Sequence, residues 1–325
     1  MIFVAKKVVI IGVGNIGFRH FQALERLEEK LEVQVVDVVS ENLEKVKAEY
    51  SANGSNNIMS LKTVSSVSEL DNDIDYAIIA TSSAVRRQLA EELLKTKHVQ
   101  NLLLEKVLFQ KMEDYDAVGS LIKEKGVNTW VSCCRRMNKS YQKLKKELAG
   151  RSFDVVVTGS DWGLGCNAIH LIDIICYLSS SETAPVCNAD MLDNEIHQSK
   201  RPGYIEFTGT INGTVGDRVK FSVTSLNSTP APVILYIFCE NNIYIIREAE
   251  QKIFRYTGES VEEMVFEMPF LSVQGADIAK AILFEGGCTL PSYEVSAKIH
   301  KAMLSALLDK MGKIEGSKVD ICKIT

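Results

Sequence analysis

The segment VVIIGVGNIGFRH, residues 8–20, constrains the fold of this chain more than any other part of the sequence. An apolar run ends at Gly12, further glycines follow at positions 14 and 17, and a stretch of helical character comes next. This order predicts a strand, a tight turn and a helix. Gly12 would permit the turn, Gly14 would let the backbone approach a phosphate, and Gly17 would let the helix pack against a sheet.

A turn of this kind favours phosphate binding, because free N–H groups and the helix dipole attract negative charge. Asp37 ends the next apolar run, about 20 residues beyond the last glycine, where a carboxylate can bind ribose hydroxyls. A carboxylate there would repel a 2′-phosphate, which favours NAD, while Ser40 or a nearby basic residue leaves NADP open. The alternative is a tight turn without a ligand. The predicted cofactor residues of the turn are Gly12, Gly14, Asn15, Ile16 and Gly17.

The distribution of apolar runs predicts two domains. Residues 1–134 alternate β-rich runs with amphipathic helical stretches, so we expect an α/β, Rossmann-type, doubly wound parallel sheet there. Residues 135–325 carry strands joined by Gly, Asn and Pro turns and then two helices. We expect an α+β domain with a large, mostly antiparallel open sheet.

Composition disfavours several classes of partner. The net charge is −5, with 37 basic and 42 acidic residues spread along the chain, so we expect neither nucleic acid nor membrane as a partner. The longest apolar runs, such as PVILYIFC, are far shorter than the roughly 20 residues that span a bilayer. Lys6 and Lys7 lead into a strand, which does not resemble a signal peptide. The eight scattered cysteines form no matched CxxC pairs, so we expect reduced thiols, no metal site and a cytoplasmic protein.

The segment NLLLEK places Glu105 and Lys106 at the end of a buried parallel strand. Open α/β sheets bind their ligands outside these strand ends. A lysine in a desolvated cleft beside a positively charged nicotinamide has a lowered pKa, which suits an acid/base catalyst. The alternative is that both side chains only solvate the strand end.

The segment SDWGLGCNAIHLIDII places His170 on an otherwise apolar helix. Asn167 and Asp173 lie three residues to either side and share its helix face. Three polar groups on one stripe indicate a lined pocket. An isolated histidine in this position would instead be part of the core.

Taken in order, GVGNIGFRH, Asp37, AIIATSS, LLLEK, CRRMNKSY and NAIHLID resemble the Gfo/Idh/MocA oxidoreductases over the whole chain. The resemblance implies an NAD(P)-dependent enzyme that oxidises a sugar or cyclitol hydroxyl, or runs the reverse reduction. The family's Glu-Lys-Pro motif matches Glu105 and Lys106, with lysine as the usual catalytic residue beside the nicotinamide. Its aspartate-xxx-histidine motif ends at His170.

The sequence departs from the family pattern at three places. Val107 replaces the family proline, so the backbone after Lys106 is expected to take a different path. Cys166 replaces the family aspartate, and Asn167 or Asp161 is expected to orient the substrate instead. The segment TSSAVRR lacks the family histidine. Residues 81–83 can still line the cofactor through backbone and hydroxyl groups. We assign this role to Thr81 and Ser82.

Three classes of function follow. The first is a sugar dehydrogenase, with a nucleotide-linked or acidic sugar held by Arg135 and Arg136 unless these arginines form structural ion pairs. The second is a reductase of a non-carbohydrate carbonyl or imine, since one fold supports many chemistries. The third is a non-catalytic sensor or scaffold that binds NAD(H). Lys106 and His170 favour an enzyme.

For an enzyme, we expect Lys106 and His170 to flank the reacting carbon of a small-molecule substrate. Lys106 would move the hydroxyl proton, and Asp173 would fix the tautomer of His170. The alternative, with Cys166 in place of the family aspartate, is that His170 is the main base. The later strands carry apolar residues on more than one face, and an uncovered apolar face is usually an interface. We therefore expect a homo-dimer or tetramer.

Overall fold

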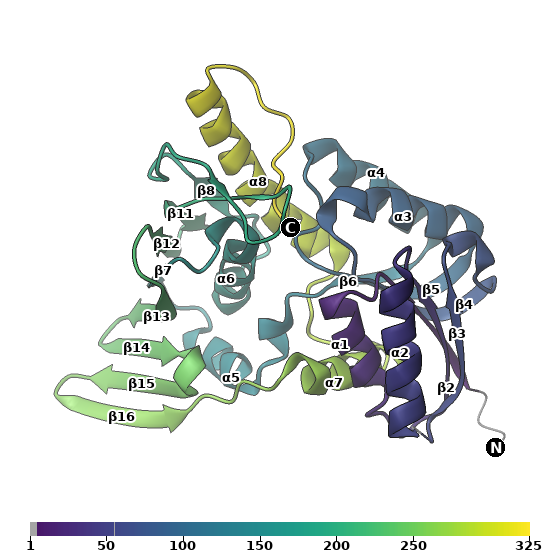
Figure 1. Ribbon diagram of the computed structural model, residues 1–325. Coiled ribbons are helices and arrows are strands. Elements are labelled where there is room, and N and C mark those ends of the chain that lie inside the picture. The colour runs from purple at the N-terminus through teal and green to yellow at the C-terminus, as the bar shows by residue number, and fades with distance from the viewer. Residues whose placement is uncertain (1–4, 55) are drawn as a thin grey trace. The chain divides into compact units, whose positions relative to one another are not determined.

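The computed structural model describes residues 5–54 and 56–325, which form two compact units (Figure 1). The first unit comprises residues up to 109 together with 116–132 and 269–293, and the second comprises 110–115, 133–268 and 294–325. The chain passes from the first unit to the second between residues 132 and 133, and the sequence analysis placed its domain boundary between 134 and 135. Residues 269–293, which the sequence analysis assigned to the later domain, lie in the first unit.

The first unit contains a doubly wound parallel sheet, as predicted. Its strands run in the order β3-β2-β1-β4-β5-β6, and every neighbouring pair is parallel. The order reverses between β1 and β4, which is where sheets of this kind bind ligands. The strands are β1 (Lys6–Ile11), β2 (Leu31–Val36), β3 (Ile58–Val64), β4 (Asp73–Ile79), β5 (His98–Leu104) and β6 (Asn128–Val131). The helices are α1 (Asn15–Leu24), α2 (Ser40–Asn53), α3 (Ser83–Thr96), α4 (Met112–Lys125) and α7 (Leu271–Phe284).

Helices cover both faces of this sheet, with α1 and α2 on one side and α3 and α4 on the other (Figure 1). The central strands are therefore buried on both faces, and Val8, Val9 and Ile10 are fully buried. Helix α7 packs on α1, where a Cβ atom added at Gly275 would lie 2.9 Å from the Cβ of Ala23. This close helix contact brings residues 269–293 into the first unit.

The second unit contains an eight-stranded sheet in the order β16-β15-β14-β13-β7-β12-β11-β8. Only β7 and β12 pair in parallel, so the predicted mostly antiparallel open sheet is confirmed. Its strands are β7 (Phe153–Ser160), β8 (Val186–Asn188), β11 (Gly209–Val215), β12 (Val219–Leu226), β13 (Ala231–Cys239), β14 (Asn242–Arg247), β15 (Lys252–Thr257) and β16 (Ser260–Val265). A small sheet pairs β9 (His197–Gln198) with β10 (Ile205–Glu206), and the helices are α5 (Lys139–Leu148), α6 (Leu164–Ser179) and α8 (Tyr293–Glu315).

The two faces of the eight-stranded sheet differ. Helices α5 and α6 lie on one side of it (Figure 1), and Val155 and Val157 point into this buried layer. Val156, between them, points to the opposite face and is 38% exposed. Phe238 and Ile243, on β13 and β14, are also exposed by more than a third. One face of the sheet therefore forms the core, and the other presents apolar side chains to solvent.

None of the eight cysteines forms a disulfide in the part of the chain that the structure describes. Four of them are buried: Cys133, Cys176, Cys239 and Cys322. Among residues 5–54 and 56–325, no helix combines the length and the apolar character needed to cross a membrane.

Candidate cofactor and active site

The glycine turn between β1 and α1 has one open position and two crowded ones. Gly12 adopts φ +84°, and a Cβ atom at Gly17 would lie only 1.8 Å from the carbonyl oxygen of Gly12. These two glycines are therefore required for the turn and for the packing of α1. At Gly14, by contrast, an added Cβ atom would meet nothing within 4 Å. The fold itself does not require this glycine, and the free space above it is where a ligand can approach the backbone.

The amino end of α1 is suited to an anion. The helix begins with no side-chain cap and no acidic residue in its first turn, and Gly14, Asn15 and Ile16 are exposed. Nearby, the buried hydroxyl of Thr81 has no hydrogen-bond partner among the described residues. Leaving such a group unpaired costs about 1–3 kcal/mol, which a bound polar ligand would recover. The turn, the helix end and this hydroxyl together fit the phosphates and hydroxyls of a dinucleotide.

Asp37 follows β2 at the same edge of the sheet. Its Oδ2 atom accepts hydrogen bonds from the backbone N–H of Val13 (2.8 Å) and from Nδ2 of Asn42 (3.1 Å), and Oδ1 accepts from the N–H of Val39 (2.9 Å). These bonds orient the carboxylate beside the glycine turn. Oδ1 has accepted one bond and can accept another, from a ribose hydroxyl for example.

Glu105 connects the end of β5 with helix α1. Its Oε1 atom lies 2.8 Å from Nε2 of His20, and both side chains are buried. Burial by itself would raise the pKa of Glu105, but the hydrogen bond and charge of His20 hold this pKa below its ordinary value. His20 lies within the opening segment of the sequence analysis, which gave it no role. The pair fixes the helix of the glycine turn against the strand end that carries Lys106.

Arg86, which the sequence analysis also missed, holds the backbone that follows Lys106. This side chain on α3 is 1% exposed, and its guanidinium donates to the carbonyls of Thr81, Val107 and Leu108. The peptide bond between Lys106 and Val107 is cis. The planar fork of an arginine can bind several acceptors at once, so one side chain ties the loop after β4 to the loop after β5.

His170 lies half-buried on α6, in the second unit. Asn167, one turn earlier, donates from Nδ2 to the carbonyls of Trp162 (2.9 Å) and Gly163 (3.1 Å) and so stabilises the start of the helix. Asp173, one turn later, is 1% exposed. Both of its oxygens accept from Arg136, at 2.8 Å from Nε and 2.7 Å from Nη2. If Asp173 also orients His170, it must do so while both of its oxygens accept hydrogen bonds from Arg136.

Arg135 forms a second buried pair. Its Nε and Nη2 atoms donate to Oε1 and Oε2 of Glu248 at 2.8 and 2.6 Å, and the hydroxyl of Tyr141 donates to Oε1 at 2.6 Å. Burial would raise the pKa of Glu248, but Arg135 lowers it. Arg135 and Arg136 thus both form bidentate ion pairs with buried carboxylates. This favours the interpretation that these arginines stabilise the structure over the interpretation that they bind the substrate.

A carboxylate does lie at the start of α6, although Cys166 occupies the family's aspartate position. Glu206, on β10, accepts from the N–H groups of Gly165 (2.6 Å) and Cys166 (3.2 Å). Asp161 is exposed and lies 3.9 Å from Lys200. Proximity in the sequence suggested Asn167 or Asp161 for this role, whereas Glu206 comes 40 residues after Cys166.

Comparison with known proteins places these features in context. Residues 6–133 match the sequence model of Gfo/Idh/MocA proteins, described as an oxidoreductase family with an NAD-binding Rossmann fold. Residues 6–133 therefore form an NAD-binding Rossmann domain of the Gfo/Idh/MocA kind. The match also confirms the predicted NAD cofactor. A search of the curated proteins found no match.

Solved structures share the fold over the full chain. A super-repressor mutant of Gal80p from Saccharomyces cerevisiae has 16% identity and a TM-score of 0.75, with 98% of each chain covered. UDP-N-acetylglucosamine 3-dehydrogenase GnnA from Acidithiobacillus ferrooxidans has 16% identity and a TM-score of 0.69, over 93% of this chain and 97% of that one. Biliverdin reductase from Synechocystis sp. PCC 6803, solved with biliverdin and NADP+, gives the same values. At this identity, the likeness describes the fold.

The structure gathers the predicted cofactor residues in one unit. The glycine turn, Asp37, Thr81, Ser82 and Glu105 follow strands or begin helices at the carboxyl edge of the parallel sheet. Lys106 belongs to this unit, whereas His170 belongs to the other. In the segment TSSAVRR, Arg86 occupies the position at which the family motif has its histidine.

The two kinds of glycine yield a matched pair of variants. Gly17→Ala should lower the free energy of unfolding by more than about 3 kcal/mol, because its Cβ would overlap the Gly12 carbonyl. Gly14→Ala should leave stability nearly unchanged but weaken NADH binding, because its methyl group enters the space left for the ligand. Urea unfolding and NADH calorimetry measure the two effects. Unimpaired NADH binding by Gly14→Ala would show that no ligand approaches this backbone.

Proposed function

We propose that this protein is an NAD(P)-dependent oxidoreductase that transfers hydride between the nicotinamide and a hydroxyl or keto group of a sugar, cyclitol or nucleotide sugar. The observation that carries the proposal is the open glycine turn at the uncapped start of α1, joined through His20 and Glu105 to the strand end that bears Lys106. This connection couples a dinucleotide cradle to a candidate acid/base residue.

The cofactor would lie with its pyrophosphate over Gly12 to Gly17, its adenosine ribose on Asp37, and Thr81 and Ser82 along its nicotinamide half. When bound, the nicotinamide supplies or accepts the hydride. Lys106 moves the proton of the reacting hydroxyl, and His170 is the second proposed catalytic group, as a hydrogen-bonding partner of the substrate. A positioned base of this kind contributes about 10²–10⁴-fold to the rate.

A carboxylate at the start of α6 supports a hydroxyl-rich substrate. Glu206 accepts one N–H group at each oxygen, and each oxygen can accept a further bond from a substrate hydroxyl. We assign to Glu206 the orienting role that the sequence analysis gave to Asn167 or Asp161. Asn167 instead supports this helix start through its bonds to Trp162 and Gly163.

The structural relatives support the substrate class and also two alternatives. One is named as a UDP-N-acetylglucosamine 3-dehydrogenase, in line with a nucleotide sugar. Another is a biliverdin reductase, which supports the reduction of a non-carbohydrate substrate. A third is a super-repressor mutant of Gal80p, which supports a non-catalytic sensor or scaffold. A turnover screen of sugars and nucleotide sugars with NAD+ and NADP+ tests the sugar class, since neither a scaffold nor a reductase of a non-carbohydrate substrate turns these compounds over.

We place the protein in the cytoplasm, where reducing conditions keep cysteines as thiols. Support comes from the eight cysteines, which form no disulfide among the described residues. The net charge of −5 supports a small molecule, and not a nucleic acid, as the partner.

Lys106→Met tests the proposed chemistry once the screen provides a substrate. The variant should lower kcat by at least about 100-fold, roughly 2.7 kcal/mol of transition-state stabilisation, because it removes the group that moves the proton. NADH affinity should stay within about twofold, since a methionine of similar length leaves the cradle intact. Lys111→Met, at a half-buried position whose side chain is 42% exposed, is the control. A kcat above half the wild-type value would show that Lys106 is structural.

We further propose that the exposed face of the eight-stranded sheet joins two subunits. Phe238 pairs across the strands with Ile243, Ile243 with Tyr256, and Tyr256 with Val261. This row runs over β13 to β16, and Phe238, Ile243 and Val261 are 42, 37 and 55% exposed. Contiguous apolar rows of this kind usually mark an interface.

Light scattering should therefore give a mass at least twice the 36.1 kDa of one chain at micromolar concentration. Phe238→Asp should shift the protein toward the monomer, because it buries an unpaired charge in the interface. Asp154 lies opposite Phe238 on β7, on the same face of the sheet. The control variant Asp154→Asn removes a charge from this face and should leave the oligomer intact. A monomeric wild-type protein would contradict the proposed interface.

A further inference from the structure

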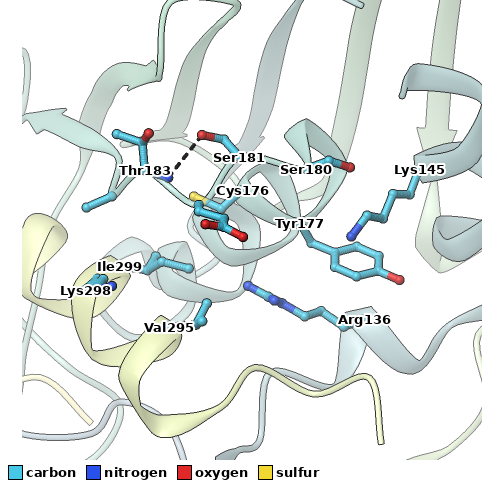
Figure 2. A pocket seen from close by; sticks show the side chains of 12 residues that line it. Arg136, Lys145, Cys176, Tyr177, Ser180, Ser181, Thr183, Val295, Lys298 and Ile299 are labelled. Carbon is cyan, nitrogen blue, oxygen red and sulfur yellow. Dashed lines mark hydrogen bonds between the residues drawn. The ribbon is translucent and has the colours of Figure 1, made fainter. Parts of the chain in front are cut away.

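Two of the described arginines are buried, and their hydrogen bonds differ in kind. Arg136 lies beside Tyr177 at a pocket of about 260 Å³ in the second unit (Figure 2), and both oxygens of Asp173 accept from its guanidinium. Arg86, on α3 of the first unit, donates instead to backbone carbonyls of two different loops. Buried polar contacts of this second kind hold the path of the backbone itself.

The first of these loops touches the glycine turn. A Cβ atom added at Gly12 would lie 2.6 Å from Cγ2 of Thr81 and 3.0 Å from its backbone nitrogen. Thr81 therefore lies directly against the turn at which we propose that the cofactor binds. Its buried hydroxyl has no hydrogen-bond partner among the described residues, so a bound ligand can supply a bond that the protein does not make. The carbonyl of the same residue accepts from Nη2 of Arg86.

The second loop carries Lys106. Nη1 of Arg86 donates to the carbonyl of Val107 and, at 2.9 Å, to that of Leu108. These two residues are 1% and 0% exposed, so water is in no position to replace the guanidinium. Lys106 directly precedes them and is half-buried. One side chain therefore holds the backbone on which this lysine is mounted.

The fork of an arginine is what this arrangement needs. A histidine, which the family motif has at this position, could donate from two ring nitrogens at most. A lysine would supply a point charge without the planar geometry that binds acceptors on both sides. Arg86 reaches three carbonyls in two loops with one rigid group.

We propose that Arg86 is a positioning residue that couples the cofactor site at Thr81 to the backbone of Lys106. Because the guanidinium is planar and rigid, a restraint on the Thr81 carbonyl at one nitrogen is passed to the carbonyls of Val107 and Leu108 at the other. A cofactor that bonds the Thr81 hydroxyl would thus restrain the loop of Lys106 as it binds. This inference rests on the proposed function, in which Lys106 moves a proton of the substrate.

Hydrogen exchange followed by mass spectrometry tests the coupling without turnover. In the wild-type protein, NADH should slow exchange at least about threefold in residues 12–18 and also in residues 105–110, because the restrained loop opens less often. In Arg86→Lys, which keeps the charge but loses the fork, NADH should still slow residues 12–18 but no longer residues 105–110. Arg87→Lys is the matched control. Arg87 pairs with Glu91 and its side chain is 39% exposed, so this variant should behave like the wild-type protein.

Kinetics distinguish positioning from a general loss of stability once a substrate is known. Arg86→Lys should lower kcat at least about tenfold while KM and NADH affinity stay within about threefold, since a misplacement of about 1 Å can cost 10²-fold in rate. A purely structural role would lower the melting temperature and leave the kcat of the folded variant unchanged.

Exchange of residues 105–110 that does not respond to NADH in the wild-type protein would overturn the proposal, and this measurement stands even if Arg86→Lys fails to fold. Equal slowing of residues 105–110 in the wild-type protein and in folded Arg86→Lys would also contradict it. If the exchange pattern is as expected but no substrate is turned over, the coupling stands and the oxidoreductase assignment fails. Absence of NADH binding would remove both.

Discussion

The contact between Gly17 and the carbonyl of Gly12 is the constraint on which the rest of this molecule depends. It lets α1 begin directly against the end of β1, which leaves the first N–H groups of the helix exposed beside an open backbone position at Gly14. From this arrangement follow both the anion-binding character of the turn and the place of His20 one turn into the helix. A side chain at position 17 would force α1 away from the sheet and separate these features.

Buried polar contacts then connect the cradle with the strand end that carries Lys106. Glu105 joins α1 to the end of β5 through His20, and Arg86 joins the loops after β4 and β5 through three carbonyls. Such contacts are costly to break, because each would leave a buried polar group unsatisfied. They fix the backbone on both sides of Lys106, although the family proline is absent. In the second unit, Glu206 supplies the carboxylate that Cys166 cannot.

The parts of this structure that could be predicted from the sequence are those that rest on local patterns. Continuous apolar strands, the spacing of the glycines and the position of Asp37 depend on neighbouring residues, and the two sheets follow from them. The polar partners could not be predicted in this way, because they come from distant positions: Arg86 binds the carbonyls of residues 107 and 108, and Glu206 binds the helix start at 165. Arg135 and Arg136 illustrate the same limit, since the acids that hold them lie 113 and 37 residues away. Residues 269–293 join the first unit through a helix contact that no local pattern reveals.

The central claim is that the glycine turn and Asp37 hold NAD(H), and calorimetric titration of the wild-type protein and Asp37→Ala with NADH and NADPH tests it most directly. The account predicts that the wild-type protein binds NADH more tightly than NADPH, because the carboxylate accepts from ribose hydroxyls and repels a 2′-phosphate. Asp37→Ala should weaken NADH binding more than NADPH binding. The opposite order, or no binding of either cofactor at millimolar concentration, would contradict the account.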